Sequence, residues 1–317
     1  MPFSNPILIE TQTVAANQLP GVFETLQGCW KSSSLLWMQA NGFPALPGLI
    51  LSGWTSDSAS AVERFCSEND FFDLLIRIEQ PGQRWTRRRG GYTIPTDQVQ
   101  RQVEELEHDG LLAILLEPAS PYSDLYSLTT ACDLESGKLD VEVVGPGFDA
   151  SDVLRSDLVP HERFEVALGS SDEEAGTDSG FLPRRLSIIG REDYRASVEQ
   201  RLEKIGARLR NPSFPDELIG SGSSGVERAA LAKEAEQFLR ATGQTMLLDH
   251  AEEYQPIPLP VLSVFLKEFQ RIFERVRTQK AHWQILSLAA SFLPRGRFVI
   301  WDFFVPGASD TTVLGRI

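Results

Sequence analysis

The most concentrated positive segment of the chain reads Arg84-Trp85-Thr86-Arg87-Arg88-Arg89-Gly90-Gly91. Arginine binds phosphate through paired N–H donors, and glycine lets the backbone approach a ligand closely. A loop that offers both is suited to the phosphates of a nucleotide, with Arg87, Arg88, Arg89, Gly90 and Gly91 as the contacts. The alternative is a solvated basic segment whose arginines pair with the abundant acidic residues.

A carboxylate at the end of an apolar run marks a second candidate position. The run Leu111–Leu116 has the length of a buried strand and ends in Glu117 and Pro118. A strand end of this kind often lines a pocket, and its exposed backbone could bind the edge of an adenine. The alternative is an ordinary strand end without a ligand.

Two further carboxylates stand inside strand-like runs. Glu142 shares one face with Asp140 and Val144 by the period-two alternation of a strand, so it is either a ligand or a solvent-facing residue. Asp302 lies within Phe298–Phe304, where burial of a carboxylate is unfavourable unless it is paired or bound to a metal. Asp302 is therefore a candidate Mg²⁺ ligand, unless it faces solvent on an edge strand.

Hydrophobic periodicity predicts the elements that must position these residues. Helices are expected over 32–40, 59–67, 96–108, 194–209, 226–241 and 259–277, with Thr96 as the cap of the third. Strands are expected over 49–51, 72–78, 111–116, 125–132, 139–144 and 298–304, the fourth and fifth joined by a hairpin turn at 133–137. Acidic or glycine-serine loops are expected over 169–180 and 212–225.

Composition limits the class of protein. The 317 residues, 42% of them hydrophobic, suffice for one elaborate domain or two lobes. The net charge of −14 disfavours nucleic acid and anionic membranes as partners, since both bind cationic surfaces. The sequence contains no apolar stretch of membrane-spanning length and no secretory signal pattern at its start. A cytoplasmic location is the resulting expectation.

Cysteine and histidine usage argues against a metal or disulfide framework. The three cysteines are Cys29, Cys66 and Cys132, and none forms a CxxC pair. The four histidines are scattered along the chain. Reduced thiols are typical of the cytosol.

Taken in order, these segments resemble the ATP-binding N-terminal region of phosphoenolpyruvate synthase and pyruvate phosphate dikinase, in the ATP-grasp superfamily. The most specific part is Asn41-Gly42-Phe43-Pro44-Ala45-Leu46-Pro47-Gly48-Leu49, which matches a Gly-x-Pro-x-Pro-Pro-Gly-Phe segment. Further parallels are Gly28–Leu36, Ile76–Glu79, Arg89–Tyr92, Ile114–Glu117, Ser127–Gly147 and Gly296–Phe304. The likeness covers about residues 20–150 and 283–305, while about 165–282 match poorly.

The resemblance implies roles for individual residues. Lys31 matches a lysine that contacts nucleotide phosphates, and Arg77 matches a phosphate-contacting arginine. Glu117 falls on the strand that holds adenine, and Asp302 falls at a catalytic glutamine position. Glu142 with Asp302 would hold magnesium.

Several positions depart from the family pattern, and these departures limit which reaction the resemblance implies. Cys29-Trp30 replaces a glycine pair, the serine pair after Arg77 is missing, and Gln284 or Ser287 stands near the position of an expected acidic residue. The sequence is too short to hold the phosphohistidine domain and pyruvate-binding barrel of those enzymes as well. Binding of ATP is therefore better supported than any particular transfer.

The resemblance implies an α/β (α+β) fold with a two-lobed ATP-grasp-like architecture, antiparallel sheets and flanking helices. The N-terminal lobe would span 1–110 and the C-terminal lobe 111–317, with a variable helical middle at about 165–282. The expected function is an ATP- and Mg²⁺-dependent ligase or phosphotransferase acting on a small-molecule or peptide acceptor. The alternatives are a non-catalytic nucleotide-binding or assembly subunit, and an α/β scaffold with an unrelated pocket.

Overall fold

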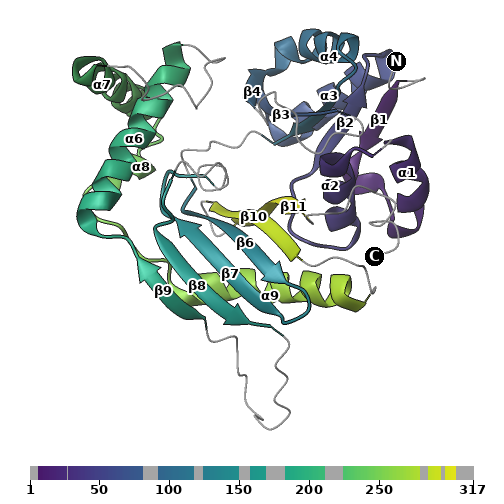
Figure 1. The fold of residues 1–317 in the computed structure, drawn as a ribbon. Coiled ribbons are helices and arrows are strands. Elements are labelled where there is room, and N and C mark those ends of the chain that lie inside the picture. Colours follow the sequence, from purple (N-terminus) through teal and green to yellow (C-terminus); the bar gives the residue numbers. More distant parts are fainter. Residues whose placement is uncertain are drawn as a thin grey trace. The chain divides into compact units, whose positions relative to one another are not determined.

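A computed structural model describes residues 6–26, 28–80, 92–117, 124–149, 158–168, 183–210, 224–278, 285–293 and 297–304. It shows a mixed fold of helices and antiparallel sheets, which confirms the predicted fold class (Figure 1). The helices are α1 (Leu19–Thr25), α2 (Trp30–Ala40), α3 (Ser56–Asn69), α4 (Val99–His108), α6 (Arg191–Arg210), α7 (Gly225–Ala241), α8 (Met246–Asp249) and α9 (Leu259–Thr278). Within the described ranges, none of these helices is long and apolar enough to cross a lipid bilayer.

The strands form two sheets. They are β1 (Ile7–Glu10), β2 (Gly48–Ser52), β3 (Asp73–Glu79), β4 (Tyr92–Pro95), β5 (Leu112–Leu116), β6 (Tyr126–Asp133), β7 (Lys138–Val144), β8 (Glu162–Ala167), β9 (Arg184–Ile188), β10 (Ile285–Leu293) and β11 (Arg297–Phe304). The first sheet has the order β1-β2-β5-β3-β4, and the second has the order β11-β10-β6-β7-β8-β9. Each predicted helix and strand corresponds to an observed element.

The chain divides into two compact units. Unit 1 comprises Met1–Ala119, Glu268–Leu288 and Val299–Ile317, and unit 2 comprises Ser120–Lys267 and Ala289–Phe298. The division therefore passes through α9, β10 and β11 rather than through a single linker.

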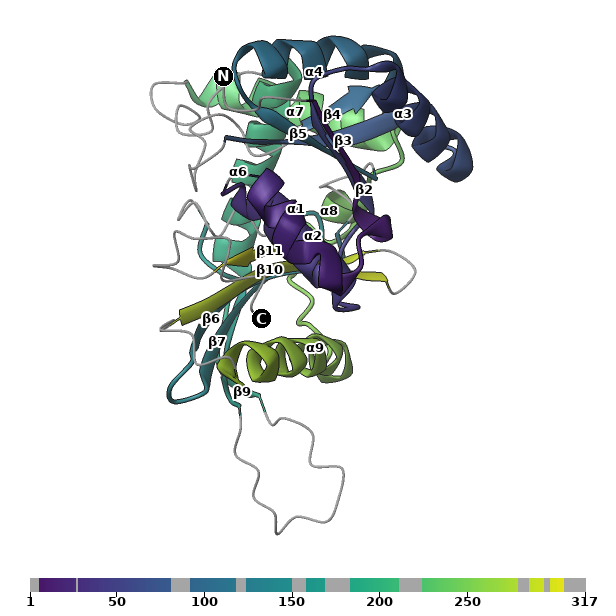
Figure 2. The ribbon, with the colours of Figure 1, turned by 90° about the vertical axis from the view of Figure 1, so that its right-hand side faces the viewer.

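Unit 1 is built on the five-stranded sheet. Successive residues of each strand point to opposite faces of this sheet, and apolar residues lie on both faces. One side packs against α3 and α4 in a buried core (Figure 2). Its strand residues are Leu49 and Leu51 of β2, Leu74, Ile76 and Ile78 of β3, Ile94 of β4, and Ala113 and Leu115 of β5. Since successive strand residues point to opposite faces, Arg77 and Glu79 lie on the face away from α3 and α4.

The predicted start of α4 is wrong by one turn. Thr96 does not cap the α-helix; it opens a short 3₁₀ turn, Thr96–Gln98, and the α-helix begins at Val99 with Gln98 as its N-cap residue. Pro95 in extended conformation precedes this turn and closes β4. The tighter turn is a common way to enter an α-helix.

Unit 2 contains the β6–β7 hairpin, which the turn residues at 133–137 correctly predict. The Asp133 side chain accepts hydrogen bonds from the backbone N–H groups of Glu135 (2.9 Å) and Ser136 (2.8 Å). Gly137 has a φ of 70°, a conformation that favours glycine. A separate buried core joins α6, α7 and α8 to Phe148 and Tyr254.

The close contact between α6 and α7 depends on Gly206. A Cβ atom at this position would overlap the backbone carbonyl of Leu231 in α7. Gly206→Ala is therefore expected to lower the free energy of unfolding by about 1–3 kcal/mol, although alanine favours helices. Urea denaturation measures the change.

Gly21→Ala in α1 is the matched control, since no atom lies within 4 Å of the added Cβ. The same exchange there should raise stability by up to about 1 kcal/mol. Equal effects at Gly206 and Gly21 would contradict the assigned α6–α7 packing.

Candidate functional site

Arg77 is the cationic side chain of β3 on the face away from α3 and α4. Its Nη1 donates to the carbonyl oxygen of Trp301 at 2.8 Å, and its Nη2 donates to Oδ1 of Asp302 at 2.7 Å. The Arg77 side chain is 12% exposed and that of Asp302 is 38% exposed. The guanidinium is thus held in a fixed orientation by β11, within unit 1.

The sequence left two interpretations of Asp302, a Mg²⁺ ligand and a solvent-facing residue. The observed side chain matches neither of them fully. It is half-buried, and its charge is paired with Arg77. The neighbouring Phe303 fixes this part of β11, because its carbonyl accepts a 2.7 Å hydrogen bond from Nε1 of Trp30 and its ring lies 5.1 Å from that of Trp37. Packing of β11 on α2 therefore determines where Asp302 meets Arg77.

A buried carboxylate from β3 caps the N-terminus of α2. Oε1 of Glu79 accepts from the backbone N–H of Lys31 at 2.5 Å, and Oε2 accepts from the N–H and hydroxyl of Ser32 at 2.9 and 2.8 Å. Glu79 is 2% exposed. Burial raises the pKa of Glu79, while the hydrogen bonds from Ser32 and Lys31 oppose that rise.

Lys31 stands at the same helix end. Its positive charge acts on Glu79 and opposes the rise in the pKa of that carboxyl. Lys31, Arg77, Glu79 and Asp302 together form what we call the β3–α2 cluster. It contains three residues expected from the sequence and one, Glu79, that was not selected there.

Glu79 already occupies the place where an anion would bind at the N-terminus of α2. The first backbone N–H groups of a helix attract negative charge. In this protein the N–H groups of Lys31 and Ser32 are satisfied by Glu79. A phosphate near this cluster would therefore meet the Lys31 and Arg77 side chains rather than the helix end.

Glu117 lies apart from the β3–α2 cluster. In the β3–β5 pairing Arg77 is opposite Ile114, and Leu75 is opposite Leu116. Glu117 therefore lies three residues along β5 from the partner of Arg77, about 10 Å at the rise of a strand. It lies toward the other end of the same sheet.

Glu142 belongs to unit 2 and points from a polar sheet face. It lies between Thr129 and Arg163 in the strand register, and its Oε1 is 3.1 Å from Nη2 of Arg163. Its side chain is 34% exposed. The second predicted magnesium ligand is thus also paired with an arginine.

The donor set for a metal does not assemble within either unit. Glu142 and Asp302 belong to different units. In the described part of the chain, no group of three or more His, Cys, Asp or Glu side chains gathers as metal ligands would. The residues Arg87, Arg88, Arg89, Gly90 and Gly91 lie outside the described residues.

The glycine-rich ending of the β6–β7 hairpin, Gly145-Pro146-Gly147, is packed rather than open. A Cβ at Gly145 would lie 2.6 Å from the Tyr254 ring, and one at Gly147 would lie 2.5 Å from Cβ of Leu247. The N–H of Gly145 donates to Nδ1 of buried His161 at 2.9 Å. Burial lowers the pKa of His161 to about 3, so the imidazole is neutral at physiological pH.

A buried polar network in unit 2 was not expected from the sequence. Oδ2 of Asp124 accepts from the hydroxyls of Ser127 (2.9 Å) and Ser291 (2.7 Å). Burial raises the pKa of Asp124 to about 7. Nearby Arg201 is 2% exposed, and its Nη2 lies 3.1 Å from Oδ2 of Asp149.

No protein-family model and no curated protein matches the chain. Solved structures that are similar to it in part include those of two synthetases. D-alanyl-alanine synthetase A from Vibrio cholerae O1 biovar eltor str. N16961 is 10% identical, with 92% of this chain covered and a TM-score of 0.33. The chain spans 61% of that protein's length. The D-cycloserine synthetase DcsG is 14% identical over 67% of this chain and 70% of its own, with a TM-score of 0.28.

Proposed function

We propose that this protein binds ATP and acts as an ATP-grasp-type ligase or phosphotransferase. The observation that supports this proposal is the β3–α2 cluster, where Lys31 and Arg77 are placed by adjoining elements of one unit. The resemblance of the surrounding sequence to ATP-grasp proteins adds to it. Two cations at one end of a sheet suit a polyphosphate, because phosphoryl transfer depends on positioning and charge neutralisation.

In this proposal Arg77 contacts the nucleotide phosphates. Its bonds to Trp301 and Asp302 use one N–H at each Nη atom, and a guanidinium carries further N–H donors that can bond a phosphate oxygen. Lys31 and the segment Arg87–Gly91 would neutralise the remaining phosphate charge. Glu117 would lie near the adenine.

Magnesium enters the proposal as the counterion of the nucleotide. Mg²⁺ is usually held by one or two carboxylates together with substrate phosphates. Asp302 in unit 1 and Glu142 in unit 2 are each proposed as a carboxylate that would bind the ion in exchange for its arginine partner.

The second candidate function is a non-catalytic nucleotide-binding subunit. The observation that favours it is the pairing of both proposed metal ligands with arginines, Asp302 with Arg77 and Glu142 with Arg163. A protein that keeps these pairs would bind a nucleotide without activating it.

Thermal denaturation with nucleotides tests both candidates. ATP with Mg²⁺ at about 100 times its Kd should stabilise the native state by roughly 2.7 kcal/mol, a rise of several degrees in Tm. A shift that needs Mg²⁺, with ADP release when carboxylate or hydroxyl acceptors are added, supports the enzyme. A shift without Mg²⁺ and without ADP release supports the binding subunit. If no nucleotide shifts Tm, both candidates are wrong.

Arg77→Ala is expected to remove the ATP-dependent shift, with a loss of at least about tenfold in affinity, since charged hydrogen bonds to phosphate are strong. Calorimetric titration of ATP into wild type and variant measures it, and the Tm of each protein without nucleotide reports the intrinsic change. Arg64→Ala is the control, because Arg64 pairs with Glu10 on the exposed surface of the same unit. Unchanged affinity in Arg77→Ala would rule out the assigned role.

A further inference from the structure

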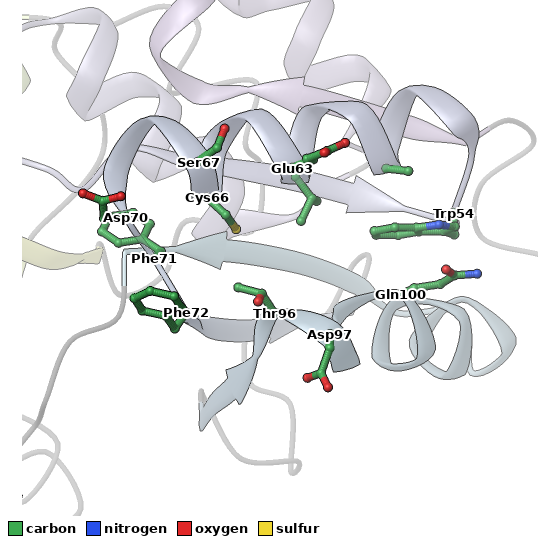
Figure 3. A pocket seen from close by; sticks show the side chains of 12 residues that line it. Trp54, Glu63, Cys66, Ser67, Asp70, Phe71, Phe72, Thr96, Asp97 and Gln100 are labelled. Carbon is green, nitrogen blue, oxygen red and sulfur yellow. The ribbon is translucent and has the colours of Figure 1, made fainter.

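A groove in unit 1 lies on the α3 and α4 side of the sheet, opposite the face that carries the β3–α2 cluster. Figure 3 shows it between α3, the residues before β3 and the start of α4. Its volume is about 530 Å³. Any ligand of this groove is therefore separate from the nucleotide proposed above.

The groove has an aromatic and apolar lining. Trp54, Val62, Cys66 and Phe71 contribute to it, all buried or half-buried. Phe72 stands at its edge with 83% of its surface exposed. Burial raises the pKa of the Cys66 thiol, so Cys66 serves as an apolar lining residue rather than as a nucleophile.

The charged residues known to line the groove are acidic. Glu63, Asp70 and Asp97 line it together with neutral side chains, and no Lys, Arg or His lines it within the described part of the chain. The nearest arginines in sequence are paired elsewhere, Arg64 with Glu10 and Arg101 with Glu105. A ligand would thus meet apolar rings bordered by carboxylates.

We propose that this groove binds a basic amphipathic segment of a partner protein, with an apolar side chain against Trp54 and Phe71 and flanking Lys or Arg residues beside Glu63, Asp70 and Asp97. Charge complementarity selects a cationic partner. The exposure of Phe72 selects a polypeptide over a small molecule, because a ligand within the groove would leave this projecting ring in water. Exposed aromatic residues are typical anchors of protein interfaces.

A displayed library of random peptides tests the proposal without assuming a sequence. The library is selected on the full chain after depletion on the Phe72→Ser variant. Enriched peptides are expected to carry an aromatic or aliphatic residue flanked by Lys or Arg. The best peptide is then synthesised with a fluorescent label and titrated by anisotropy.

Substitutions of the exposed Phe72 ring and of the acidic groove residues should each weaken binding of the synthesised peptide. Phe72→Ser is expected to weaken it by about fivefold or more, the effect of losing a buried anchor. Glu63→Gln with Asp97→Asn is expected to weaken it by a similar factor and to reduce its salt dependence. All three residues line the surface of the groove, and circular dichroism and Tm verify that each variant is folded.

Matched controls lie in unit 2. Val226→Ser replaces another side chain that is 83% exposed, and Glu199→Gln with Glu253→Gln removes two exposed carboxylates. These variants should bind as wild type does. The proposal is overturned by a selection that enriches no basic amphipathic peptide, and equally by a peptide whose affinity falls as much in the unit 2 controls as in the groove variants.

Discussion

Replacing Glu79 with alanine is expected to lower the free energy of unfolding by roughly 3–5 kcal/mol. The substitution leaves two backbone N–H groups, of Lys31 and Ser32, and the Ser32 hydroxyl without their acceptor. Buried donors that lose a charged partner incur the full desolvation penalty. Urea denaturation followed by circular dichroism measures the loss.

Two further variants distinguish the loss of the helix cap from the general effect of shortening a glutamate side chain. Glu79→Gln keeps an acceptor oxygen but places an amide N–H near the other donors, so about half of the loss is expected. Glu68→Ala, on the exposed surface of α3, should change stability by less than about 0.5 kcal/mol. If Glu79→Ala proved as mild as Glu68→Ala, Glu79 would not be the cap of α2.

The Glu79 cap also explains part of what the sequence could and could not predict. The helix over 32–40 is predictable from its apolar residues, but its true start at Trp30 is not. Cys29 at the N-cap makes no side-chain hydrogen bond to the helix. The absence of a local Ser, Thr, Asp or Asn cap was the available signal that a distant residue supplies the acceptor.

Asp302 shows a second limit. Its sequence context correctly indicates a carboxylate that needs a partner. That partner, Arg77, is 225 residues away in the chain, and the packing of Trp30 and Trp37 on Phe303 holds β11 where the two meet. Pattern and composition do not encode such a long-range register, so a metal and an arginine were equally consistent with the sequence.

The strands that were not predicted differ from one another in pattern. β1, β4, β8, β9 and β10 were absent from the predicted elements, although the last three share a sheet with the predicted β6–β7 hairpin. All five residues of β9 are exposed, so it lacks the apolar alternation that marks a half-buried strand. β10 begins with an exposed residue and continues into a nearly uninterrupted buried run, which is consistent with a strand or a helix by periodicity alone.

Asp124 gives the second large effect, as a dependence of stability on pH. Its pKa is raised from 3.8 to about 7 by burial, which outweighs the hydrogen bonds from Ser291 and Ser127. Asp149 raises the pKa further, and Arg201 lowers it. The native state thus holds this proton more tightly than the unfolded chain, so Asp124 lowers stability progressively as the pH rises from about 4 to about 7.

Asp124→Asn should remove this dependence. Relative to wild type, the variant's free energy of unfolding is expected to increase by roughly 4 kcal/mol between about pH 4 and about pH 8. The comparison with wild type is required because buried His161, with its pKa lowered to about 3, acts in the opposite direction and destabilises the fold as the pH falls below about 6.5. Urea denaturation at a series of pH values measures both proteins.

Asp133→Asn provides a control of opposite sign. Hydrogen bonds from Ser136 and Glu135 lower the pKa of Asp133, so its ionised form stabilises the native hairpin and this contribution is lost as the pH falls. Relative to wild type, Asp133→Asn should therefore lose stability as the pH rises toward about 4, whereas Asp124→Asn gains it as the pH rises from about 4 to about 7. A flat difference between Asp124→Asn and wild type over this pH range would show that the pKa of Asp124 is not raised, because the hydrogen bonds from Ser291 and Ser127 and the charge of Arg201 then outweigh burial.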